Sequence, residues 1–237
     1  MTEPDRVAVE TSIAAPFETV WHALRDPASI RRWHGWEYDG LDTEIAEIYL
    51  HGVKADEPAG TIAIAEGSRF VVEDHGPQTV VRVTMAAPAG DAGWGEFYDD
   101  IREGWTSFVH QLRFALERHP GEDRRTLQLD GAGPRPLVPA ALGLDGAERA
   151  GEPYAGTTGW GERWSGEVLF RNEHQIGLTV DGYGPGLVVL HAKPPAKRPP
   201  HGGGMAIVTS YGLDAAAQAA LEDRWAAWWR EHYPPAR

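Results

Sequence analysis

The segment 15–36, APFETVWHALRDPASIRRWHGW, constrains the fold most, because it places two short helices directly one after the other. Pro16 suits the first helical position, where its missing N–H costs no hydrogen bond. Asp26 and Pro27 repeat this start signal, with Asp26 as the N-cap residue. One helix face is predicted from the spacing of Phe17, Val20, Trp21 and Leu24. Because Trp33 and Trp36 end the segment, we expect it to close one end of a cavity.

Extended segments surround this helix pair, and a long helix follows them. Alternation and β-branched residues predict strands over Val7–Ile13, Thr43–Val53, Gly60–Ala65, Ser68–Asp74 and Gln78–Ala87. An apolar stripe predicts a helix near Arg102–His119. This order predicts an α+β class, in which a curved antiparallel sheet wraps around the long helix.

The second half of the chain resembles a degenerate copy of the first. Residues 72–81 read VEDHGPQTVV and residues 180–189 read VDGYGPGLVV, at an offset of 108. Each segment precedes an aromatic helix that ends near His and Pro. We therefore expect two domains, a helix-grip domain over 1–120 and a degenerate repeat over 121–237 without the helix pair.

The first half contains four short motifs: Ala-Pro-x-x-x-Val-Trp at 15–21, Asp-Pro at 26–27, Arg-Trp at 32–33 and Gly-Trp at 104–105. In these motifs it resembles the SRPBCC (START-like) superfamily, and within it the domains similar to the activator of heat-shock protein 90 ATPase. This resemblance implies a helix-grip fold, in which a cavity lies between sheet and helix. It leaves the function open, because the superfamily includes lipid carriers, aromatase/cyclases, co-chaperones and stress proteins.

Composition excludes several classes of function. The net charge is −13, and residues 1–120 carry 10 Lys and Arg against 21 Asp and Glu, which gives −11. Such a chain repels phosphate backbones and anionic lipids, so we expect neither a nucleic-acid nor a membrane partner. There are no cysteines, which excludes disulfides and thiolate chemistry. The N-terminus has no apolar signal segment, which predicts a cytoplasmic protein.

Motif searches predict no catalytic residues, no metal and no cofactor. His201-Gly-Gly-Gly resembles an esterase oxyanion loop, but no G-x-S-x-G elbow accompanies it, and we interpret it as a flexible loop. The GYGPG turn at 182–186 lacks the spacing of a dinucleotide-binding loop. The histidines have no metal-ligand spacing, so we expect His22, His34, His51 and His75 to face solvent or cap helices.

The function predicted first is the binding of a hydrophobic small molecule between the sheet and the helix, without catalysis. Large apolar residues are frequent in both the strands and the helices of the first half. The hydroxyl of Tyr49 would orient the ligand. The predicted lining residues are Trp33, Trp36, Tyr49, Phe70, Val72, Val83, Met85, Trp105, Phe108 and Leu112.

Two alternatives remain open. A chaperone-type interaction module of a stress response would use the acidic first half to bind a basic protein partner. An aromatase/cyclase-type enzyme would need a buried polar side chain that moves protons. The candidates for that role are Tyr49, His51, Arg69 and Arg82.

Overall fold

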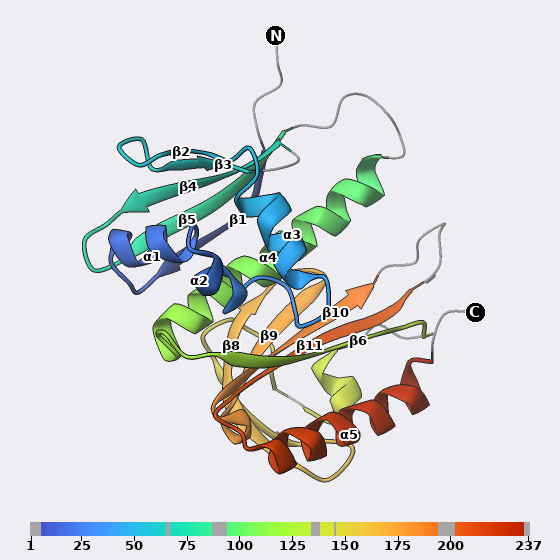
Figure 1. Cartoon of the computed structure of the whole chain (residues 1–237). Helices are drawn as coiled ribbons and strands as arrows, with labels where there is room; N and C mark the ends of the chain where they lie inside the picture. The colour runs from blue at the N-terminus through green and yellow to red at the C-terminus, as the bar shows by residue number, and fades with distance from the viewer. Residues whose placement is uncertain are drawn as a thin grey trace. The chain divides into compact units, whose positions relative to one another are not determined.

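The chain folds into two compact units, Met1–Glu122 and Asp123–Arg237. The structure is a computed structural model that describes residues 6–64, 67–86, 94–133, 138–144, 146–193 and 202–234. Each unit contains one antiparallel sheet followed by a long C-terminal helix (Figure 1). This arrangement confirms the predicted α+β, helix-grip layout.

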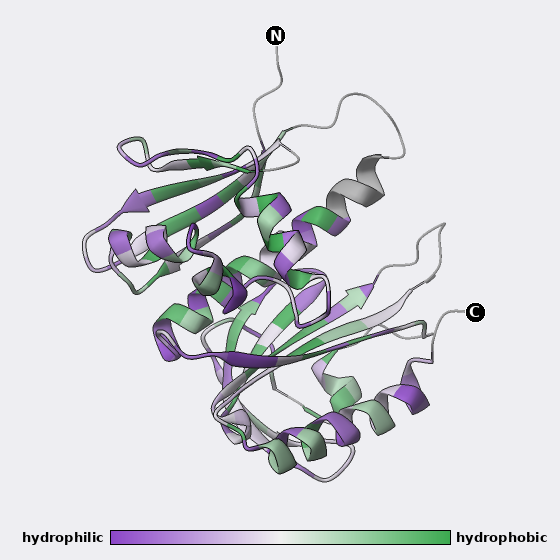
Figure 2. Ribbon diagram, viewed as in Figure 1, coloured by the Kyte–Doolittle hydropathy of each residue, from purple (hydrophilic) through white to green (hydrophobic). Residues whose placement is uncertain are grey.

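The first unit builds a five-stranded sheet in the order β1-β5-β4-β3-β2. On β5 every second residue is buried, so Val81, Val83 and Met85 face the core. Figure 2 shows the corresponding alternation of hydrophobic and hydrophilic residues along the strands. The elements are β1 (Arg6–Ile13), α1 (Phe17–Ala23), α2 (Pro27–Arg31), α3 (Leu41–Tyr49), β2 (Lys54–Asp56), β3 (Thr61–Ala63), β4 (Ser68–Asp74), β5 (Thr79–Met85) and α4 (Trp94–Arg118).

The ends of the helices follow the start signals of the sequence. Pro16 has an extended conformation and is the N-cap of α1 rather than its first helical residue. The Asp26 carboxylate accepts a hydrogen bond of 2.8 Å from the Ser29 N–H, which makes it the N-cap of α2. Helix α4 begins at Trp94, earlier than predicted. Near its end, Glu117 accepts a hydrogen bond of 2.8 Å from the Ala14 N–H, which joins α4 to the segment after β1.

The prediction of a strand over Thr43–Val53 was wrong, because this part of the chain begins as helix α3. Its β-branched residues favoured an extended interpretation. The buried residues of α3, however, are Leu41, Ile45 and Tyr49, which stand four apart and share one helix face. The helical period therefore determines the structure, and it brings Tyr49 into the core from a helix.

The second unit repeats the layout of the first. In both sheets the first strand pairs with the last, and the remaining strands follow in reverse order, here β6-β11-β10-β9-β8-β7. The 3-10 helix η2 stands where the first unit has α1 to α3. The elements are β6 (Arg124–Gly131), η2 (Pro139–Leu142), β7 (Pro153–Thr157), β8 (Arg163–Arg171), β9 (Gln175–Val180), η3 (Asp181–Tyr183), β10 (Gly186–Lys193), β11 (Gly203–Tyr211) and α5 (Ala215–His232).

The sequence match at offset 108 does not join equivalent hairpins. It pairs the β4–β5 hairpin with β9–β10, although β5 is the last strand of its sheet and β10 is the last but one. The hairpin at the position of β4–β5 is β10–β11. The evidence for a duplication is therefore the shared order of the strands. The sequence match at offset 108 reflects only two similar Gly-Pro turns.

Close backbone packing explains glycines of the second unit. Gly184 follows η3 with a φ of 79°, and a Cβ there would lie 1.7 Å from the Tyr211 carbonyl oxygen. Gly203 opens β11, and a Cβ would lie 2.2 Å from the Gly131 oxygen. The interpretation of His201-Gly-Gly-Gly as a loop was therefore wrong for the glycines at 203 and 204, which belong to a strand. His201 lies outside the described residues.

We expect Gly184→Ala to lower the free energy of unfolding of the second unit by more than about 2 kcal/mol, because the left-handed conformation and the clash add up. Gly182→Ala is the matched control, since a Cβ at Gly182 meets nothing within 4 Å. Urea denaturation followed by tryptophan fluorescence measures both variants. Equal stabilities of the two variants would contradict this account of the turn.

Candidate functional site

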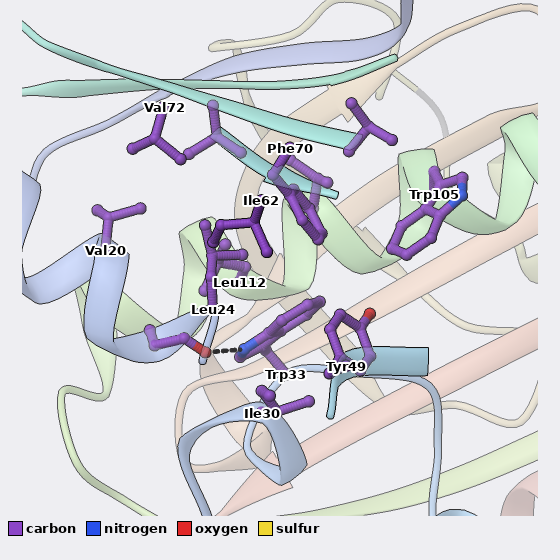
Figure 3. Close-up of a cluster of buried hydrophobic side chains, with 14 of the residues drawn as sticks. Val20, Leu24, Ile30, Trp33, Tyr49, Ile62, Phe70, Val72, Trp105 and Leu112 are labelled. Atoms are coloured by element: carbon purple, nitrogen blue, oxygen red, sulfur yellow. Dashed lines mark hydrogen bonds between the residues drawn. The ribbon is translucent and has the colours of Figure 1, made fainter. Parts of the chain in front are cut away.

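The ten predicted lining residues converge on the core of the first unit. Trp36 and Phe108 are half-buried, and Phe108 packs against this core. The strand residues Phe70, Val72, Val83 and Met85 are all buried on the inner face. The members of the core cluster include Trp33, Tyr49, Phe70, Val72, Val83, Met85, Trp105 and Leu112. Figure 3 shows the sheet, α3, α4 and the α1–α2 segment all contributing to this cluster.

Trp33 occupies the centre of the cluster and is only 1% exposed. Its indole N–H donates a hydrogen bond of 2.9 Å to the Ala23 carbonyl oxygen, which fixes the ring between α1 and α2 (Figure 3). Its ring meets Tyr49 edge-on at 5.5 Å and Phe70 at 6.5 Å between centroids. Edge-to-face contacts of this kind add to the stabilisation from burial. Trp33 thus joins the helix pair to α3 and to the sheet.

The aromatic network continues to the edge of the cluster. The Phe70 and Trp105 centroids lie 5.5 Å apart, and those of Trp105 and Phe108 lie 6.3 Å apart. Phe108 in turn contacts Trp36 at 6.4 Å. Because the rings contact one another along this path, a ligand that enters the cluster must displace at least one of them. The rings of Trp36 and Phe108 are the half-buried ones on this path.

A chain of polar side chains reaches this cluster, and sequence reasoning missed it. His34 is 1% exposed, so the expectation that it faces solvent or caps a helix was wrong. Its Nδ1 lies 2.8 Å from the Tyr49 hydroxyl oxygen, and its Nε2 lies 3.2 Å from Glu44 Oε1. The exposed Tyr38 donates a hydrogen bond to the other oxygen of Glu44. The four side chains thus connect the protein surface with the buried phenol.

Electrostatics favour an ionised Glu44 and neutral tyrosines in this chain. The hydrogen bond from His34 lowers the pKa of Glu44, although partial burial opposes the shift. Burial raises the pKa of Tyr49 well above its usual value, and the charge of Glu44 adds to this effect. The hydrogen bond to Glu44 raises the pKa of Tyr38 to about 12. At neutral pH the chain therefore holds one carboxylate and two protonated phenols.

The other candidates for proton transfer do not reach the cluster. The His51 side chain is 66% exposed and lies on the surface of the protein beside Glu47. Arg82 binds Glu10 and Glu73 on the outer face of the sheet, and Arg69 is exposed. Tyr49 alone of the four candidates is buried among the predicted lining residues. Glu44 was not predicted as a partner of Tyr49, because residues 43–53 were predicted as a strand. In a strand these two side chains would not have the relative positions that helix α3 gives them.

The second unit has an aromatic cluster of its own. Trp225 is fully buried, and its centroid lies 5.3 Å from that of Trp160 and 5.8 Å from that of Trp164. Its indole N–H donates to the Tyr183 hydroxyl at 3.3 Å, and this hydroxyl donates to Glu162 at 3.2 Å. Burial raises the pKa of Tyr183. This cluster lies between α5 and its sheet, and the His232 ring stacks on Trp228 at its edge, with centroids 4.2 Å apart.

No group of three or more His, Cys, Asp or Glu side chains able to hold a metal ion occurs among the described residues. None of the helices in the described part of the chain is long and apolar enough to cross a membrane.

Comparison with known proteins gives matches among solved structures only. No family model matches the chain, and no curated protein matches it. The crystal structure of DynU16, a protein in the dynemicin biosynthetic locus, has 17% identity and a TM-score of 0.33, and the match covers 93% of each chain. The di-domain ARO/CYC BexL from the BE-7585A pathway has 11% identity and a TM-score of 0.35 over 98% of this chain and 99% of that one.

The di-domain ARO/CYC StfQ from the steffimycin pathway has 14% identity and a TM-score of 0.34 over 94% of this chain and 91% of that one. At such identities and TM-scores, these similarities carry no argument about the activity of this chain.

We expect Glu44→Gln to destabilise the first unit at neutral pH, where the charge of Glu44 strengthens the hydrogen bond from His34. Because the folded-state pKa of Glu44 lies below its usual value, this stabilisation is present above about pH 4.5 and is lost as the pH falls further. The difference between variant and wild type in urea denaturation should therefore shrink on acidification. Glu47→Gln, an exposed position on the same helix, is the control. A difference that does not change with pH would assign the effect to packing instead of charge.

Proposed function

We propose that the first unit binds a hydrophobic, aromatic small molecule within the cluster formed by Trp33, Tyr49, Phe70, Trp105 and Phe108. The observation that carries this proposal is the position of the Tyr49 hydroxyl, which is buried among apolar rings and hydrogen-bonded to His34. Ligand sites typically combine an apolar lining with a few convergent polar groups.

The route of entry follows from the exposure of the rings. Trp36 lies in the connection between α2 and α3, and Phe108 lies on α4 beside His34, with centroids 4.6 Å apart. Both rings are half-buried. Movement of these two side chains would open the cluster without breaking the hydrogen bond that holds Trp33. The buried lining residues then give shape, and Tyr49 gives orientation.

Titration with the solvatochromic dye Nile red tests this function, with indole N–H signals read by NMR. The expected result is saturable binding that shifts the signals of Trp33, Trp36 and Trp105. The tryptophans of the second unit, Trp225 and Trp228, serve as internal controls and should keep their signals. Native mass spectrometry of the purified protein would add any copurified ligand. Dye binding that leaves the first unit's indoles unchanged would contradict the proposal.

A second candidate function is an enzyme of the aromatase/cyclase type. The burial of Tyr49 beside His34 favours it, because such an enzyme needs a polar group that moves protons inside an apolar site. Turnover of a poly-carbonyl substrate, lost in Tyr49→Phe, would separate this candidate from simple binding.

The interaction-module hypothesis stays a prediction, as does the relation to the activator of heat-shock protein 90 ATPase. The charge of −11 in residues 1–120 implies that binding to a basic partner would weaken with salt. Its discriminating observation is a pull-down that captures such a salt-sensitive partner.

A further inference from the structure

The positions of the protons between Glu44 and Tyr49 follow from the types of the groups. An ionised carboxylate only accepts hydrogen bonds, so the contact of 3.2 Å requires a proton on His34 Nε2. In its neutral form His34 carries one N–H, at Nε2, so its Nδ1 is an acceptor. In this form the Tyr49 hydroxyl, whose oxygen lies 2.8 Å from Nδ1, donates its only proton to it. Glu44 thus sets the direction of both hydrogen bonds.

This direction leaves the Tyr49 oxygen with lone pairs and no further proton to donate. The Tyr49 ring that carries this oxygen lies among the rings of Trp33, Phe70 and Trp105, whose centroids are 5.5 to 6.3 Å from that of Tyr49. In Figure 3 the oxygen is directed toward the side of the cluster where Trp105 lies. A ligand carbonyl oxygen would face the Tyr49 oxygen, and two acceptors form no hydrogen bond. A ligand hydroxyl would instead donate a hydrogen bond to the Tyr49 oxygen.

We propose that the first unit selects ligands with a phenolic or enolic hydroxyl and removes the proton of that hydroxyl through Tyr49 and His34. This inference rests on the function proposed above. The ligand O–H bond breaks as an O–H bond to Tyr49 forms, and the original Tyr49 proton passes to His34 Nδ1. The products are a ligand oxyanion and an imidazolium, and the latter is stabilised by the Glu44 carboxylate.

The roles within this chain differ. Tyr49 touches the ligand and is its acid–base partner. His34 accepts the proton that Tyr49 passes on. Glu44 acts through His34, so it is a positioning residue that determines the polarity of the Tyr49 hydroxyl. The Tyr38 hydroxyl is bound to Glu44 at the exposed end of the chain. An acidic hydroxyl on an aromatic ring therefore matches both the polarity and the apolar surroundings of this site.

Two probes that share the nitrophenyl group test the selection. The first, para-nitrophenol, carries a hydroxyl and absorbs at longer wavelength as an anion; the second, para-nitroanisole, has a methyl ether in place of the hydroxyl. We expect the phenol to bind at least about tenfold more tightly and to show the anion band at a pH below the pKa of the free probe. In Tyr49→Phe the two probes should bind within about twofold of each other, without the anion band.

A matched control and a second variant allow the inference to be tested even if Tyr49→Phe does not fold. Tyr154→Phe removes another buried hydroxyl, which donates to the Thr179 carbonyl oxygen in the second unit, and it should preserve the preference for the phenol. His34→Gln replaces the imidazole with a side chain that cannot become a cation, so it should abolish the anion band even if Tyr49→Phe fails to fold.

The outcomes separate this inference from the proposed function. If Nile red binds in the first unit but the two probes bind equally, the hydroxyl selection is wrong and the binding function stands. If the phenol binds preferentially but remains neutral, the proton transfer is wrong. If neither Nile red nor the probes bind, both proposals fail. Preference for the phenol that persists in Tyr49→Phe would also overturn the inference.

Discussion

The first unit depends on the hydrogen bond between the Trp33 indole N–H and the Ala23 carbonyl oxygen. This bond satisfies a donor that would otherwise be buried without a partner, which costs roughly 1–3 kcal/mol. It also determines which way the ring points, and hence which faces of Tyr49 and Phe70 it meets. The short helices α1 and α2 have too few residues to be stable alone. Their position on the sheet therefore depends on this tryptophan.

Much of the layout could be predicted because local signals and tertiary packing agree. The alternation in Ser68–Asp74 and the capping residue Asp26 lead directly to β4 and α2. Eight of the ten residues predicted to line a site lie in the core, because large apolar side chains at strand and helix spacing face inward. All four strand residues of that prediction point inward, which periodicity alone could not decide, since it does not say which face is buried.

The polar chain could not be predicted because its parts are brought together by tertiary structure. His34 follows the end of α2, whereas Glu44 and Tyr49 lie on α3. The β-branched residues of α3 led to its prediction as a strand. No spacing rule joins a loop histidine to a carboxylate ten residues later. The second unit shows the same limit in another form. Its similarity to the first lies in the order of its strands, whereas the matching letters at offset 108 join different hairpins.

The pairing of first with last strand has a consequence for how the chain acquires its structure. In the first unit Ile13 pairs with Thr79, and in the second Gly131 pairs with Gly204. Contacts of such sequence separation slow folding, because a long loop must close before they form. During translation, β1 therefore has no strand to pair with until β5 has been synthesised. The sheet of the first unit can then form while the second unit is still being translated. The slow closure of the long loop therefore occurs in one unit after the other.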